Sequence, residues 1–131
     1  MTDPSELKYS RTHEWVRVKG KRLIVGMSEY AQSQLSDIIS IELPDPDENH
    51  YDAGDDLGVV ESTRTTADFH APVDGVITAI NTKLLADPEL INTDPYGAGW
   101  LIVIALSDLK EADALMSAAQ YEAYLVTAGG H

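Results

Sequence analysis

The sequence contains no cysteine among its 131 residues. Disulfide bonds, thiolate metal sites and cysteine nucleophiles are therefore excluded within this chain. Its histidines are scattered, without the close helical or turn spacing of a zinc site. We accordingly expect no bound metal at the four of them, His13, His50, His70 and His131.

Basic residues are also scarce, with nine Lys and Arg against 22 Asp and Glu, which gives a formal net charge of -13. A surface with that field repels phosphate backbones and anionic lipid, so we expect no nucleic-acid partner and no membrane association. Two interpretations of the acidity stay open. It either keeps the protein in solution or steers it toward basic patches on partner proteins.

No uninterrupted apolar run reaches the length needed to span a membrane. The first residues, Met-Thr-Asp-Pro-Ser-Glu, lack both a basic region leading into an apolar segment and an Arg-rich amphipathic pattern. We therefore expect a cytoplasmic protein, unless processing removed a leader. The length suits a single domain over residues 1–131, and we expect a monomer.

Catalytic motifs are missing as well. The Gly97-Ala98-Gly99 stretch lacks the length and the strand-to-helix setting of a phosphate-binding loop, and it favours a turn. Neither a nucleophile elbow nor a kinase-like set of motifs is present. We predict a protein that is not an enzyme and has no catalytic residues.

Short strands joined by turns account for most of what the sequence does contain. Residues 15–19 alternate in polarity, and Gly20 allows a reversal into a second alternating strand. Ile39, Ile41 and Leu43 alternate with polar residues before a proline. Residues 100–106 form a continuous apolar run, which we predict to be the most deeply buried strand.

Helical signals are few. Ser28 is a plausible N-cap for a short helix over residues 29–35, and one further helical turn is expected around Leu84 and Leu85. Apolar residues spaced by three and four predict a longer helix over about residues 109–125. Its candidate capping pair is Asp108 with Glu111. The predicted fold is mainly β, with two small antiparallel sheets packed as a sandwich, a short internal helix and a C-terminal helix.

Residues 57–72 predict a strand, a polar reversal and a second strand, with Arg64 at the tip. The segment between the two apolar stretches, residues 61–68, carries hydroxyls and charge and has little to bury. This is the pattern of a loop that presents its tip to solvent.

The hairpin closely resembles that of the glycine cleavage system H-protein family, a relative of lipoyl domains. In that family Glu-Ser-Val-Lys-Ala-x-x-Asp precedes an apolar strand and the lysine carries lipoate. Here Glu61, Ser62 and Asp68 match, whereas Arg64 stands at the lysine position. Further matches in the same order cover most of the chain, at Tyr9 and at residues 13–16, 28–32, 41–44, 89–92 and 94–100.

This resemblance implies a barrel-sandwich hybrid fold and a carrier that performs no catalysis itself. In the family, the lipoyl arm takes an aminomethyl group from glycine decarboxylase (P protein) to the aminomethyltransferase (T protein). Dihydrolipoamide dehydrogenase then reoxidises the arm, and a lipoate ligase is a further partner. The resemblance also implies a cleft that shelters the loaded arm, with His13, Glu14 and Tyr30 as its candidate residues.

Arg64 is the departure that matters for function. An amide with lipoate needs an amine that can lose its proton, whereas a guanidinium stays protonated and delocalised. We therefore predict no covalently bound lipoate. The nearest lysine along the sequence is Lys83, which we expect to be a solvated loop residue.

Two hypotheses follow. The first is a non-lipoylated H-protein-like module that regulates or binds H-protein partners, and the second is an H protein that acts as the aminomethyl carrier in glycine catabolism. For the segment around Glu14, we also weigh a purely structural interpretation, in which Trp15 packs on the sheet while its neighbours face water.

Overall fold

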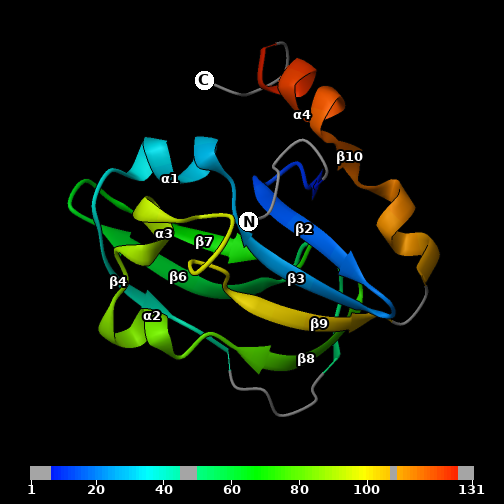
Figure 1. The fold of residues 1–131 in the computed structure, drawn as a ribbon, viewed down its shortest axis with the longest axis horizontal. Coiled ribbons are helices and arrows are strands. Elements are labelled where there is room, and N and C mark those ends of the chain that lie inside the picture. The colour runs from blue at the N-terminus through cyan, green and yellow to red at the C-terminus, as the bar shows by residue number, and fades with distance from the viewer. Residues whose placement is uncertain (1–6, 45–49, 107–108, 127–131) are drawn as a thin grey trace.

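Two antiparallel sheets pack against each other across one apolar core (Figure 1). The computed structural model describes residues 7–44, 50–106 and 109–126. The larger sheet has seven strands, in the order β10 (Met116–Ser117), β1 (Lys8–Tyr9), β2 (Glu14–Lys19), β3 (Arg22–Met27), β9 (Ile102–Leu106), β8 (Gly75–Ile80) and β5 (His50–Tyr51). The smaller has three, in the order β4 (Ile38–Glu42), β6 (Asp56–Ser62) and β7 (Thr66–His70). The prediction of a mainly β fold with two antiparallel sheets is confirmed, although the larger sheet is not small.

The core lies between the sheets because each strand turns alternate side chains toward it. Val25 and Ile104 enter from the larger sheet, and Val60 and Phe69 enter from the smaller one; all four side chains are buried. A phenylalanine or isoleucine buried to this extent stabilises the folded state by about 1.5 to 3 kcal/mol. The core therefore holds the two sheets, and the hairpins at their ends, in a fixed relation.

The short helix α1 (Glu29–Leu35) has the bounds that the sequence predicts. Ser28 caps it, since its side-chain oxygen accepts a hydrogen bond from the Ala31 amide at 3.2 Å. Two further single-turn helices, α2 (Lys83–Ala86) and α3 (Leu90–Thr93), occupy the segment for which one turn was expected. Asn92 of α3 ties this segment to α1, because its side-chain nitrogen donates to the Ser36 carbonyl at 2.8 Å.

Strand β9 is not buried on both faces, so the prediction that residues 100–106 form the most deeply buried strand is wrong. Ile102 and Ile104 are fully buried, whereas Val103 between them is half-buried. Only one face of the larger sheet meets this core, and on the other face Ile24 and Val103 remain partly exposed. In β4 a bulge next to Ile39 turns that side chain outward, where 52% of it is exposed, against the predicted alternation.

The C-terminal segment is not one helix over residues 109–125. It forms the 3₁₀ helix η2 (Leu109–Ala114), then β10, then the helix α4 (Ala118–Tyr124). The helical period is broken because Met116 pairs with Tyr9 of β1. The predicted capping pair involves side chains outside the described residues. The observed cap is Ser117, whose side chain accepts from the Gln120 amide at 3.2 Å while Gln120 bonds back to the Ser117 amide at 2.9 Å.

The capping role of Ser117 gives a test of this interrupted helix. We expect Ser117→Ala to lower the free energy of unfolding by about 1 kcal/mol, because it removes an N-cap acceptor. The matched control is Ser33→Ala within α1, where alanine is the better helix former and stability should stay within about 0.5 kcal/mol. Urea unfolding measures both. If a continuous helix ran through position 117, the two substitutions would instead have the same small effect on the free energy of unfolding.

Candidate functional site

The tip of the β6–β7 hairpin is a tight reversal built around Ser62. Its side-chain oxygen accepts hydrogen bonds from the backbone amides of Arg64 at 3.2 Å and Thr65 at 3.1 Å. Its own amide donates to the Thr65 carbonyl at 2.8 Å, and Ser62 is buried although it sits beside the exposed tip. Since these bonds use backbone groups of residues 64 and 65, the conformation of the tip does not depend on their side chains.

The side chain at the tip is exposed to solvent. Arg64 and both its neighbours, Thr63 and Thr65, are exposed. Within the described part of the chain, no acidic side chain forms an ion pair with the Arg64 guanidinium. Glu61, three residues before Arg64, accepts a hydrogen bond from the hydroxyl of Ser40 on neighbouring β4 at 2.8 Å. The hairpin thus presents Arg64 as a free group on a rigid support.

A cleft of about 410 Å³ lies between the start of β2, helix α1 and strand β7. The three residues that the sequence suggests for an arm cleft, His13, Glu14 and Tyr30, all line it, and so does Asp68. Ser62 and Arg64 do not line it, but Ala67 of β7 does. The structure therefore brings the predicted cleft residues together, next to the strand that leads away from the hairpin tip.

Glu14 is the buried carboxylate of this cleft, with 2% of the residue exposed. The interpretation that His13 and Glu14 face water is therefore wrong for Glu14. One oxygen of Glu14 accepts from the hydroxyls of Ser10, at 2.5 Å, and Thr12. The other accepts from the His70 amide at 3.1 Å. Burial raises the pKa of Glu14, and these hydrogen bonds oppose the rise by favouring the charged form.

The imidazole of His70 lies between two carboxylates. Its Nε2 is 2.9 Å from Asp56 at the start of β6, and its Nδ1 is 3.6 Å from Glu14. That Nδ1 is buried without a hydrogen-bond partner in the described part of the chain. His70 therefore connects the cleft carboxylate to one at the surface, where 69% of the Asp56 side chain is exposed.

His13 shapes the other wall of the cleft. Its backbone has a φ of 74°, a left-handed conformation that is uncommon for residues other than glycine. Its Nδ1 lies 2.7 Å from the Tyr121 hydroxyl, which also lies 2.8 Å from the Ser28 hydroxyl. Burial lowers the pKa of His13 and raises that of Tyr121 to about 12. Helix α4 is thereby attached to the mouth of the cleft through Tyr121.

Several of these residues have no local signal in the sequence. The partners of Glu14, namely Ser10, Thr12 and His70, belong to two separate segments of the chain. Tyr121 lies more than a hundred residues after His13. A clue exists only for His70, which follows the apolar Phe69 and so falls on the opposite face of β7.

No group of three or more His, Asp or Glu side chains in residues 7–44, 50–106 and 109–126 is arranged to hold a metal ion.

Comparison with known proteins places the chain among its relatives. The model of the family described as glycine cleavage H-protein matches residues 7–128. The chain belongs to this family. It is therefore a non-catalytic protein, in agreement with the absence of catalytic motifs, and the lipoyl-domain-like fold expected from its hairpin is confirmed.

Curated relatives agree over nearly their full lengths. The glycine cleavage system H protein of Acinetobacter baylyi is 45% identical over 125 residues, which cover 95% of this chain and 100% of that protein. That of Symbiobacterium thermophilum is 46% identical over 121 residues, covering 92% of this chain and 94% of the relative. A crystal structure of a glycine cleavage system H protein from Mycobacterium marinum matches with a TM-score of 0.82 at 34% identity, covering 92% of this chain and 97% of that one.

The raised pKa of Glu14 predicts how stability changes with pH. Because burial favours the neutral form of the carboxyl group, the folded state binds the Glu14 proton more tightly than the unfolded chain does. In the unfolded chain the pKa of this group is near 4.5. From there up to the folded-state pKa, the contribution of Glu14 to the free energy of unfolding falls as pH rises, by up to about 1.4 kcal/mol per pH unit.

Urea unfolding of the native chain and of Glu14→Gln over a pH series measures this contribution. We expect the stability of the native chain relative to Glu14→Gln to decline with rising pH. Glu61→Gln makes the same chemical change at an exposed position and serves as the control. If the stability of the native chain relative to Glu14→Gln instead increases as pH rises, the pKa of Glu14 is not raised in the folded state.

Proposed function

We propose that this protein is a non-lipoylated member of the H-protein family, which docks with glycine cleavage partners without carrying a covalent lipoyl arm. The observation behind the proposal is the residue at the hairpin tip. Arg64 is exposed at the position where the family has its acceptor lysine, and the surrounding turn is intact. The partners proposed by family resemblance are the P protein, the T protein, dihydrolipoamide dehydrogenase and lipoate ligase. A monomeric, cytoplasmic protein is part of the same proposal.

Lipoate does not fit the residues of this hairpin. Its carboxyl group needs a nucleophilic amine to form an amide, and the delocalised guanidinium of an arginine is not such a nucleophile. The hydroxyls of Thr63 and Thr65 are not amines, so the exposed tip offers no substitute. Lys83 is exposed, but it begins α2 and lies outside the hairpin. The hairpin tip therefore has no side chain that could carry a lipoyl group as an amide.

A second candidate function is the aminomethyl carrier itself, acting between the P and T proteins in glycine catabolism. The comparisons favour it, since the relatives at 44 to 46% identity are named glycine cleavage system H proteins and none is named a regulator. This function requires an arm attached in an unexpected way. The intact mass of the protein isolated from its own host distinguishes the two candidates, because only the carrier contains the added mass of a lipoyl group.

The hairpin itself can be tested by one substitution. Arg64→Lys places an amine on a support that already has the required turn, so we expect at least partial modification by a lipoate ligase, while the native chain stays unmodified. The stability cost should be at most a few tenths of a kcal/mol, since an exposed basic residue contributes little. Mass spectrometry after incubation with ligase, lipoate and ATP measures the outcome.

Thr63→Lys is the matched control, because it places the same amine one residue away on the same exposed turn. We expect little or no modification there. Uptake of lipoate by the native chain would refute the claim that Arg64 prevents attachment. If Arg64→Lys also stays unmodified, the tip has diverged beyond the acceptor position.

If this protein docks with glycine cleavage partners without an arm, it should compete with a lipoylated H protein for them. Added to a glycine cleavage assay that contains a lipoylated H protein, the native chain should slow the reaction, and more lipoylated H protein should relieve the inhibition. An equal concentration of the chain unfolded by heat is the control. Unchanged rates at a large excess of the native chain would argue against docking and leave the fold without its proposed partners.

A further inference from the structure

A second hollow, of about 560 Å³, lies on the outer face of the larger sheet, away from the core. Its walls come from β2, β3, β9 and the loop before β9. We call it the outer groove. It is lined by Trp15, Arg17, Ile24, Tyr96, Trp100 and Val103, and at one end by Asp94, whose carboxylate accepts a hydrogen bond from the Ala98 amide at 2.9 Å.

The floor of the outer groove is a row of side chains across three strands. Arg17 pairs with Ile24, and Ile24 pairs with Val103, so the three side chains lie on the same face. Each is half-buried. The row places two apolar side chains beside a guanidinium, and the half-buried Trp100 adds an aromatic wall.

A second row carries the basic charge. Lys19 pairs with Arg22, and Arg22 pairs with Ala105, two residues further along each strand and hence on the same outer face. Such a step is about 7 Å along a strand. Lys21 follows in the turn, and Lys19, Lys21 and Arg22 are all exposed. The groove therefore continues directly into a cluster of cations.

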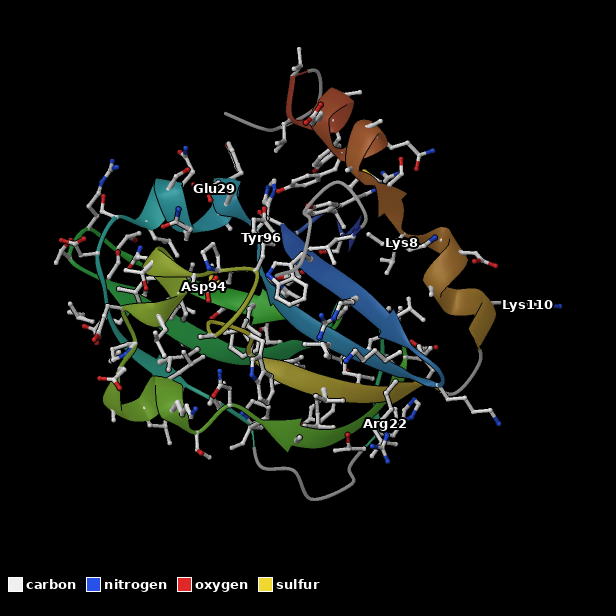
Figure 2. All side chains as sticks on the ribbon, viewed as in Figure 1. Lys8, Arg22, Glu29, Asp94, Tyr96 and Lys110 are labelled. Atoms are coloured by element: carbon white, nitrogen blue, oxygen red, sulfur yellow. The ribbon has the colours of Figure 1, made fainter. Side chains whose placement is uncertain are left out.

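This cluster is exceptional within an acidic protein. Four of the nine basic residues of the chain fall within positions 17–22, although the net charge is -13. At physiological ionic strength the screening length is about 8 Å, so the local cations dominate over acidic groups elsewhere. At the other end of the strands, the loop with Asp94 and Tyr96 closes the groove (Figure 2).

The groove is also preformed. The Trp15 indole nitrogen donates to the Pro95 carbonyl at 2.8 Å, which fixes the loop that forms its upper wall. The Tyr96 hydroxyl accepts from the Glu29 amide at 2.8 Å, which fixes the same loop to α1. A ligand that binds here finds its apolar walls in place and loses little ordering entropy on the protein side.

We propose that the outer groove and the adjoining cations bind an acidic segment of a partner protein that carries one bulky apolar side chain. The apolar side chain enters the groove against Ile24, Val103 and Trp100. The carboxylates that follow it along the segment pair with Arg17, Lys19 and Arg22. A long polyanion such as nucleic acid is less suitable, since it lacks the apolar side chain and would extend over the acidic remainder of the surface.

This surface lies apart from the hairpin tip. Figure 1 shows the β2–β3 turn and the β6–β7 hairpin at opposite ends of the molecule. A segment in the outer groove therefore leaves Arg64 accessible, and the groove shares no lining residue with the cleft around Glu14. The inference does not depend on the absence of a lipoyl arm.

The two tryptophans of the chain, Trp15 and Trp100, both line the outer groove, so intrinsic fluorescence reports on it directly. The probe is a synthetic peptide with one leucine followed by a run of glutamates and no aromatic residue. We expect a saturable change in tryptophan emission. Replacing the glutamates by glutamines, or the leucine by glycine, should weaken binding about fivefold or more.

Lys19→Glu should weaken binding of the glutamate peptide by a similar factor. Lys83→Glu makes the same charge change at an exposed lysine on α2 and should leave the affinity unchanged. Circular dichroism confirms that both variants remain folded. The proposal is overturned by an emission that does not change, by equal binding of the glutamine peptide, or by equal effects of the two variants.

Two other occupants have their own signatures, and either would also overturn the proposal. A mixed-sequence oligonucleotide that gives the same saturable change and competes with the peptide would identify a nucleic-acid site. Sedimentation that shows a dimer dissociated by the peptide would identify a second copy of this chain as the occupant.

Discussion

The packing of Trp15 on Gly26 determines how the cleft and the outer groove are built. A Cβ atom at Gly26 would lie 2.5 Å from the indole, so only glycine leaves room for the ring against β3. The seated indole then donates to the Pro95 carbonyl and fixes the loop that walls the outer groove. Because successive residues of a strand point to opposite faces, placing Trp15 outward places Glu14 inward, toward the cleft. One close contact between neighbouring strands thus sets both surfaces.

The inward position of Glu14 imposes a cost that the surrounding residues offset. An ionised carboxylate loses hydration on burial, and it is tolerated only when hydrogen-bond donors replace the water. Two hydroxyls from the turn before β2 and one backbone amide from β7 do so here. The bond from the His70 amide also joins the two sheets at this end of the molecule. The turn containing His13 accordingly adopts a left-handed backbone conformation, and Tyr121 holds it from outside.

The sequence predicts those elements whose signals are local. Helix α1 was placed correctly because its cap, Ser28, and its apolar spacing lie within a few residues of each other. The C-terminal helix was placed wrongly because the spacing of Ala112, Leu115 and Met116 is also compatible with a strand that pairs with β1 far away in the sequence. Likewise, Trp100 and Val103 belong to a continuous apolar run, and no local rule separates a strand buried on both faces from one whose outer face lines a groove.

In the candidate site too, only the residues with local signals can be predicted from the sequence. Residues 61–68 could be identified as a presenting hairpin because polarity and turn residues change over a short stretch. The neighbours of Glu14 could not be identified, because pairing of β6 with β7 and packing of the two sheets bring them together only in the folded chain. Family resemblance supplied the candidate cleft residues where local physics did not, but it did not indicate that Glu14 is buried.

The hairpin tip shows how the stability of a turn and the chemistry of its side chain can be independent of each other. The turn is held by Ser62 through backbone groups, and the side chain at position 64 extends into solvent without taking part in the turn. A substitution there costs the fold almost nothing, since exposed loop side chains contribute little to stability. It changes the chemistry completely, because lysine can be acylated and arginine cannot. The stability of this turn therefore places no requirement on the side chain at position 64. The cleft differs from the hairpin tip in this respect. Glu14 and its hydrogen-bond partners are part of the packing, so the fold requires them whether or not an arm enters the cleft.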